Sequence, residues 1–159
     1  MFTALAPRPI AEGPRRRHDA RVNRFSLEAV LLTELDGLAV DDHQARYVVE
    51  AVCGGFSVEV PRMRFHARRS PYTGATEQPR WLLVELHGIE DVRRIEERRG
   101  SSLPLKGAIR LGRVTTLMTV AHELGHHLVF CLDRPRTPGH GKRWVQRFDE
   151  AARAIRRIL

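Results

Sequence analysis

The 159-residue sequence contains only two cysteines, Cys53 and Cys131, and no long apolar run. Two cysteines are too few for a disulfide framework or a cysteine-based zinc ribbon, so we expect reduced thiols. No apolar run approaches the roughly 18 residues of a membrane-spanning helix, and the N-terminal arginines follow the short apolar stretch, which is the wrong order for a secretory signal. These absences predict a cytoplasmic protein without a membrane span.

Lysine is also scarce, although the chain is basic. The formal net charge is +8, and Lys106 and Lys142 are the only lysines, an arginine bias that fits a GC-rich genome. Residues 1–24 and 140–159 each hold six basic and two acidic side chains, so the excess charge lies at the two ends. Because clustered arginines attract phosphate, DNA is a candidate partner of these ends.

The residue pattern divides the chain into an arm and one domain. Pro, Arg and Gly without periodicity predict a mobile basic arm over residues 1–18, followed by a single domain over residues 19–159. Apolar residues at helical spacing predict helices over residues 24–38, 41–53, 89–99, 115–132 and 142–159. Alternation and short apolar runs predict strands over residues 56–65, 81–86 and 106–111, with loops over 66–80 and 133–141. This order implies an α+β domain.

The helix predicted over residues 115–132 contains an H-E-x-x-H motif, formed by His122, Glu123 and His126. The two histidines lie four residues apart, so they share one face of the helix and point away from its apolar stripe. Two imidazoles at this spacing can reach one zinc ion at about 2.0–2.1 Å. Glu123 is then placed to act on a zinc-bound water rather than on the metal. The apolar stripe consists of Leu117, Val120, Ala121, Leu124 and Leu128.

Tetrahedral zinc needs a third protein ligand if its fourth position is to stay open for water. His140 is the first choice, because the loop after the motif helix is long enough to turn back. The positive end of the helix that follows it also favours a neutral imidazole. Glu150 and then Asp133 are the alternatives. His127 is a poor ligand, since it lies about 100° around the helix from the nearest motif histidine.

The segment HELGHHL at residues 122–128, followed by HGKRW at residues 140–144 after a proline-containing loop, resembles the SprT-like zinc metallopeptidases. Small metallohydrolases of actinobacteria and their phages are also similar. The resemblance covers residues 105–150 and implies a zincin-like fold, in which a small mixed or antiparallel sheet packs on the motif helix between flanking helices. It further implies a set of site residues: His122, His126 and His140 for the metal, Glu123 for the base and Trp144 behind the site.

The sequence therefore predicts a zinc-dependent metallopeptidase, an endopeptidase that hydrolyses protein or peptide substrates with Glu123 as general base. A substrate strand is expected to pair with the edge of the strand over residues 106–111. Tyr72, His127 and nearby arginines are candidates for stabilising the oxyanion.

Two other classes of function stay open. One is a nucleic-acid-binding or interaction protein with a structural zinc site, which Cys131 or Asp133 would close as fourth ligand. The other is a metal hydrolase that acts on a non-peptide bond, because the motif activates water but does not determine which kind of bond is hydrolysed. The remaining histidines are interpreted as ordinary surface or hydrogen-bonded residues, namely His18, His43, His66 and His87.

Overall fold

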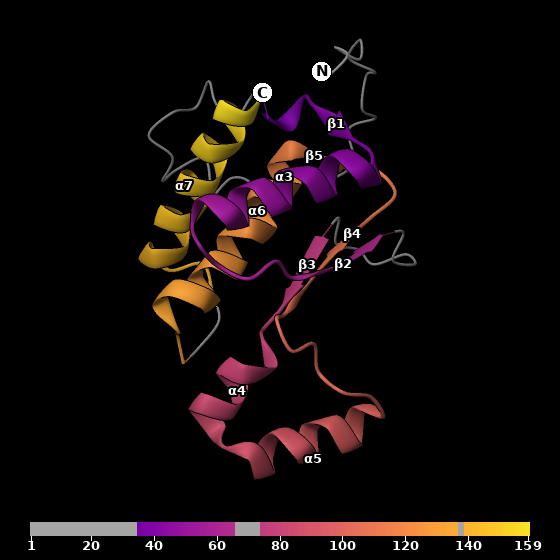
Figure 1. Ribbon diagram of the computed structural model, residues 1–159, viewed down its shortest axis with the longest axis vertical. Helices are drawn as coiled ribbons and strands as arrows, with labels where there is room; N and C mark the ends of the chain where they lie inside the picture. The colour runs from indigo at the N-terminus through magenta and orange to yellow at the C-terminus, as the bar shows by residue number, and fades with distance from the viewer. Residues whose placement is uncertain (1–34, 66–73, 137–138) are drawn as a thin grey trace.

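A computed structural model describes residues 35–65, 74–136 and 139–159 and has an α+β architecture (Figure 1). The arm over residues 1–18 and most of the helix predicted over residues 24–38 lie outside the described residues. In the described part, no helix combines the length and the apolar character needed to cross a membrane. The elements in chain order are β1 (Ala39–Val40), α3 (Asp42–Gly55), β2 (Arg62–Phe65), β3 (Gly74–Glu77), α4 (Arg80–His87), α5 (Ile89–Arg99), β4 (Ala108–Leu111), β5 (Thr115–Thr116), α6 (Leu117–Leu128), the π-helical turn η1 (Val129–Asp133) and α7 (Lys142–Ile158).

Three short strands form a mixed sheet in the order β2-β4-β3, and the α+β class that the sequence predicts is confirmed. Strand β2 runs parallel to β4, with Met63 opposite Ile109, and β3 runs antiparallel to it, with Thr76 opposite Ile109. Because β4 is hydrogen-bonded on both sides, it has no edge for a substrate strand, and the expectation placed on residues 106–111 is wrong. Strands β1 and β5 form a separate antiparallel ladder at the start of α6.

Helix α6 is the central element of the main core, in contact with the sheet, α3 and α7. Its five stripe residues are all buried, which confirms the predicted apolar face. Helix α7 buries a matching stripe against it, which begins with Trp144 and Phe148 and ends at Ile155. The helix end that carries the H-E-x-x-H motif is therefore held between the sheet and two helices.

Local signals explain the helix boundaries that the sequence predicts well. Asp41 caps α3: its carboxylate accepts a hydrogen bond from the Gln44 amide at 2.8 Å, and the Gln44 side chain accepts one from the Asp41 amide at 3.0 Å. Gly100 ends α5 with φ +73°, a left-handed conformation that glycine adopts without strain. These caps satisfy backbone groups that a helix end otherwise leaves without partners.

The strand predicted over residues 56–65 and the loop predicted over residues 66–80 are both partly wrong. Of the strand predicted over residues 56–65, only the last four residues form a strand, β2, because α3 runs on to Gly55 and Ser57 turns the chain with φ +54°. Within the predicted loop, Gly74–Glu77 forms β3, although Gly and Ala are poor strand formers. Pairing with β4 overrides this weak local preference.

The strand predicted over residues 81–86 is helical, as part of α4. A short apolar run does not distinguish a buried strand from a buried helix, and Pro79 precedes the first helical residue here. Helices α4 and α5 form a hairpin between β3 and β4, at the end of the molecule away from α7 (Figure 1). Leu82 of α4, Val92 of α5 and Leu103, which follows α5, are buried but are not part of the main core cluster.

Candidate metal centre

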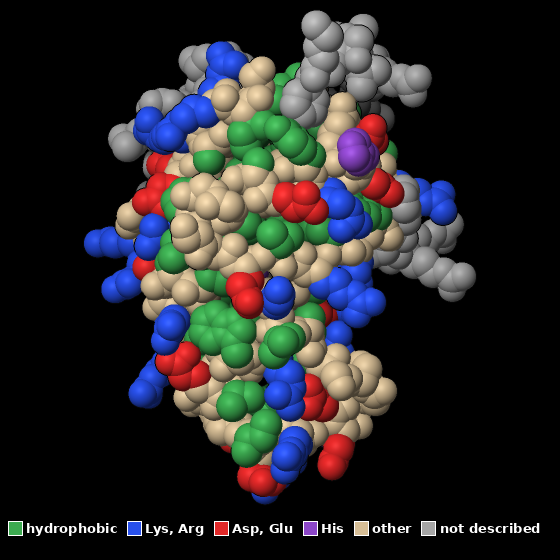
Figure 2. Space-filling view, in the orientation of Figure 1, with side chains coloured by type: hydrophobic (Ala, Val, Ile, Leu, Met, Phe, Trp, Pro, Cys, Tyr) green, Lys and Arg blue, Asp and Glu red, His purple; other side chains and the backbone are tan. Residues whose placement is uncertain are grey.

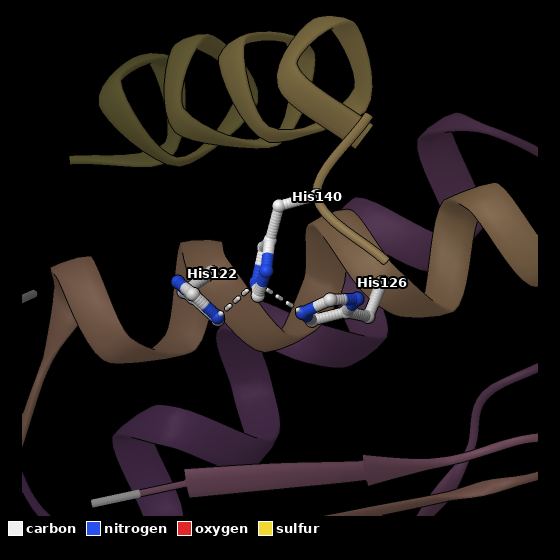
Figure 3. Close-up of side chains that lie close together, drawn as sticks. All are labelled: His122, His126 and His140. Atoms are coloured by element: carbon white, nitrogen blue, oxygen red, sulfur yellow. Dashed lines mark hydrogen bonds between the residues drawn. The ribbon is translucent and has the colours of Figure 1, made fainter. Parts of the chain in front are cut away.

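Three imidazoles converge beside α6, as Figure 3 shows. His122 and His126 project from the same face of α6, and His140 reaches them from the loop that precedes α7. The Nε2 atom of His140 lies 3.0 Å from Nε2 of His126 and 3.3 Å from Nε2 of His122. The structure thus brings together the three histidines that the sequence singles out.

The spacing of these nitrogens suits a metal ion. Ligands at about 2.0–2.1 Å from a tetrahedral zinc ion lie about 3.3–3.4 Å from one another, close to the separations found here. One potential ligand atom from each residue falls within 4.8 Å of both others, so the three histidines could hold a metal ion. A hydrogen-bonded trio is a poorer match, because a single Nε2 proton on His140 cannot serve both neighbours at once.

Close contact between α6 and α7 creates this geometry. A Cβ atom on Gly125 would lie only 3.1 Å from the Cα atom of Phe148, so glycine inside the motif lets the two helices approach. Trp144, with 2% of its surface exposed, packs its ring 4.3 Å from that of His140, 4.9 Å from that of His122 and 5.4 Å from that of His126, measured between centroids. This tryptophan forms an aromatic wall behind the three imidazoles.

Glu123 lies between the two motif histidines in sequence, but its side chain is directed to the sheet. It is 5% exposed, and its Oε2 atom accepts a hydrogen bond from the Thr76 hydroxyl at 2.7 Å. Gly74, also on β3, faces the same carboxylate. Sequence reasoning missed both β3 residues because they fall in the stretch predicted to be a loop.

An ion-pair network fastens the two ends of the loop that carries His140. Arg147 on α7 donates to both carboxylate oxygens of Asp133, at 2.8 and 3.1 Å, and Arg143 donates to the same carboxylate at 3.1 Å. The Asp133 side chain is 8% exposed, and hydrogen bonding from Arg147 holds its pKa below the ordinary value. This clamp, defined by Asp133, Arg143 and Arg147, joins the end of η1 to the first turns of α7.

The alternative ligands weighed from the sequence lie outside the cluster. The carboxylate of Asp133 is engaged by the clamp, and that of Glu150 accepts hydrogen bonds from Arg147 at 2.7 Å and Gln146 at 2.9 Å. Burial raises the pKa of Cys131 to about 11, which keeps its thiol protonated and disfavours it as a thiolate ligand. Among the described residues, no fourth His, Cys, Asp or Glu joins the three histidines.

His127 belongs to the core rather than to the site. Its ring is fully buried, and its Nε2 atom donates to the Glu59 carbonyl oxygen at 2.8 Å and lies 3.5 Å from the Cys131 sulfur. Burial lowers its pKa, which favours the neutral ring. The suggestion that His127 stabilises an oxyanion is wrong, because this ring is turned into the protein.

The other histidines that the sequence analysis names do not join the cluster in the described structure. His43 and His87 are exposed and lie apart from it, and His18 and His66 lie outside the described residues, as does Tyr72.

Comparison with known proteins gives no relative. No protein-family model, no curated protein and no solved structure matches this chain.

Proposed function

We propose that this protein is a zinc-dependent metallopeptidase with a zincin-like arrangement of sheet and motif helix. One observation carries the proposal: the Nε2 atoms of His122, His126 and His140 converge, while Glu123 of the same motif is held in a buried position beside β3. Three neutral imidazoles with one adjacent carboxylate are the set of side chains that metal-assisted hydrolysis requires.

The residues divide the chemistry between them. His122, His126 and His140 would hold the zinc ion, which when bound would lower the pKa of water to about 7 and polarise a carbonyl group. Glu123 accepts a proton from the attacking water and returns it to the leaving amine nitrogen as the peptide C–N bond breaks. Trp144 excludes solvent behind the imidazoles and keeps them in one orientation.

The sheet supports a peptide as the substrate. Among the described strands, β3 pairs with β4 alone, so it is an edge strand, and it is the strand that contacts Glu123. An extended peptide can add to such an edge through main-chain hydrogen bonds, and this would bring a scissile bond to the carboxylate. We therefore assign to β3 the substrate pairing that the sequence suggested for residues 106–111.

A set of three ligands among the described residues favours an enzyme over a structural zinc site. Structural zinc is closed by four protein ligands, whereas catalytic zinc keeps one position for water or substrate. The described residues offer three ligands, and both residues considered for closing the site, Cys131 and Asp133, make other contacts.

The substitution Glu123→Gln tests the proposal. It removes the proton acceptor and leaves the three imidazoles in place, so zinc content should not change, while hydrolysis of an unfolded protein substrate should fall about 10²- to 10⁴-fold. The matched control is Glu97→Gln, at an exposed position of α5. Equal hydrolysis by the two variants, or no hydrolysis by the zinc-loaded wild type, would contradict the proposal.

A further inference from the structure

We infer that Gly74 and Thr76 of β3 form a cradle that positions the Glu123 carboxylate for proton transfer. The inference rests on the proposed function and deepens it, since it names two positioning residues for the reaction. Neither residue is among the predicted ligands or the base. Both come from a strand that lies 47 or more positions before Glu123 in the chain.

The hydroxyl of Thr76 makes two contacts with Glu123. Its Oγ1 atom lies 2.7 Å from Oε2 of the carboxylate and 3.1 Å from the main-chain oxygen of the same residue. A hydroxyl has one proton, and the shorter distance indicates that it is donated to the carboxylate. A hydrogen bond to an ionised acceptor is short and directional, so it fixes the orientation of the carboxylate plane.

Gly74 makes room for the other carboxylate oxygen. A Cβ atom at position 74 would lie 2.8 Å from Oε1 and 2.9 Å from Cγ of Glu123, which is closer than real Cβ atoms come. The glycine is therefore required by a close approach. Any larger residue would push the carboxylate away from β3 and break its bond to Thr76.

The two contacts act on different atoms of one group. Thr76 restrains Oε2, and the space at Gly74 accommodates Oε1, so together they select one rotamer of a side chain that has three rotatable bonds. The same strand, β3, is the edge to which we assign the peptide substrate, so one element would hold both the Glu123 carboxylate and the substrate. General bases work at hydrogen-bond distance from the proton that they accept, so a misplaced carboxylate slows the chemical step.

Thr76→Val is the first test, because it replaces the hydroxyl with a methyl group of similar size. We expect kcat to fall about 10- to 100-fold, as for other outer hydrogen-bond partners of metal sites, with KM and zinc affinity unchanged. Thr76→Ser retains a hydroxyl and should restore most of kcat. The control is Thr115→Val, which removes a buried hydroxyl bonded to the Gly112 carbonyl oxygen and leaves Glu123 alone.

Gly74→Ala is the second test and acts on the opposite oxygen. The clashing atoms all belong to the Glu123 side chain and none to the main chain, so the variant should fold and bind zinc while kcat falls. Gly54→Ala is its control, because a Cβ atom there meets nothing within 4 Å. Crystal structures of the wild type and both β3 variants give a readout other than activity: the carboxylate should turn away from β3 in each variant.

The outcomes separate this inference from the proposed function. Thr76→Val with wild-type kcat, alongside an inactive Glu123→Gln, would overturn the cradle and leave the peptidase standing. A loss of activity in Thr76→Val that serine does not restore would also overturn it, because the hydroxyl would not be the cause. A zinc-loaded wild type without hydrolysis would remove the proposed function first and the inference with it.

Discussion

Apolar and aromatic contacts hold the region around His122, whereas the α4–α5 hairpin buries few apolar side chains and carries several ion pairs. Helices α3, α6 and α7 enclose a continuous core that reaches up to the three imidazoles. Leu82 and Val92 are the buried residues of the two hairpin helices, and ion pairs join Arg80 to Glu96 within the hairpin and Glu85 to Arg134, which follows η1. Figure 2 shows basic and acidic side chains interspersed over this end of the molecule.

The difference between the two regions indicates that exact side-chain positions matter around the three histidines more than in the hairpin. Packed side chains cannot shift by small amounts without losing contacts, so a metal site built on them keeps its geometry. Exposed ion pairs are weak and screened by salt, so they tolerate movement. We therefore expect substitutions in the first region to change metal binding and catalysis, and those in the hairpin to change local stability alone.

The largest effect should follow His140→Ala, which removes one of the three proposed zinc ligands. Zinc affinity should fall about 100- to 1000-fold, because each ligand carries a share of the total binding free energy. Competition with a chromophoric chelator measures this. His43→Ala is the control, since His43 is exposed on α3 and lies apart from the cluster. Equal zinc affinity in the two variants would mean that His140 is not a ligand.

Asp133→Asn should have the next largest effect, because it weakens the clamp that joins the two ends of the His140 loop. Loss of the charge opposite Arg147 should destabilise the fold by about 1–2 kcal/mol. Where about 1.4 kcal/mol of this loss destabilises the loop conformation that places His140 beside the other two histidines, zinc affinity falls about tenfold. Chemical unfolding and chelator competition measure the two quantities, and an unchanged zinc affinity would show that the clamp does not position His140.

The same clamp predicts a pH dependence of stability. Because Arg147 lowers the pKa of Asp133 in the folded protein, the stabilisation is fully present above the ordinary carboxyl pKa of 3.8 and is lost as pH falls through the lowered value. The stability difference between wild type and Asp133→Asn should accordingly shrink over that acidic range. A difference that stays constant into acid would contradict this account of the clamp.

The smallest effect should come from Glu96→Gln in the hairpin. Glu96 accepts hydrogen bonds from Arg80 at 2.7 Å and from the Leu103 amide at 2.9 Å, so its loss should speed amide hydrogen exchange across residues 80–104. Zinc affinity and kcat should stay at their wild-type values. Asp91→Asn, at an exposed pair on the same hairpin, is the control and should change none of these. A fall in zinc affinity in Glu96→Gln would contradict the claim that substitutions in the hairpin change local stability alone.

The three-histidine cluster could be predicted because its signals are local or chemically specific. A four-residue spacing puts His122 and His126 on one face of any α-helix, and the loop before His140 is long enough to turn back to them, which made His140 the first choice ahead of Glu150 and Asp133. The apolar stripes of α6 and α7 follow from the same periodicity, and the cap of α3 follows from Asp41.

The surroundings of the site could not be predicted because they depend on contacts distant in sequence. Strand β3 has no local strand signal, and it exists because β4 pairs with it. The hydroxyl of Thr76 therefore reaches Glu123 only through the fold. Asp133 was considered as a ligand because its residue type allows it, but its carboxylate accepts hydrogen bonds from Arg147, which lies 14 residues later on α7.

The most direct test of the central claim is X-ray absorption at the zinc edge on protein loaded with one equivalent of zinc, in the wild type and in His140→Ala. We predict three imidazole nitrogens at about 2.0–2.1 Å in the wild type, with one oxygen of a non-protein ligand completing the shell, and two imidazoles in the variant. A sulfur ligand, four protein ligands, or identical spectra for the two proteins would contradict the account.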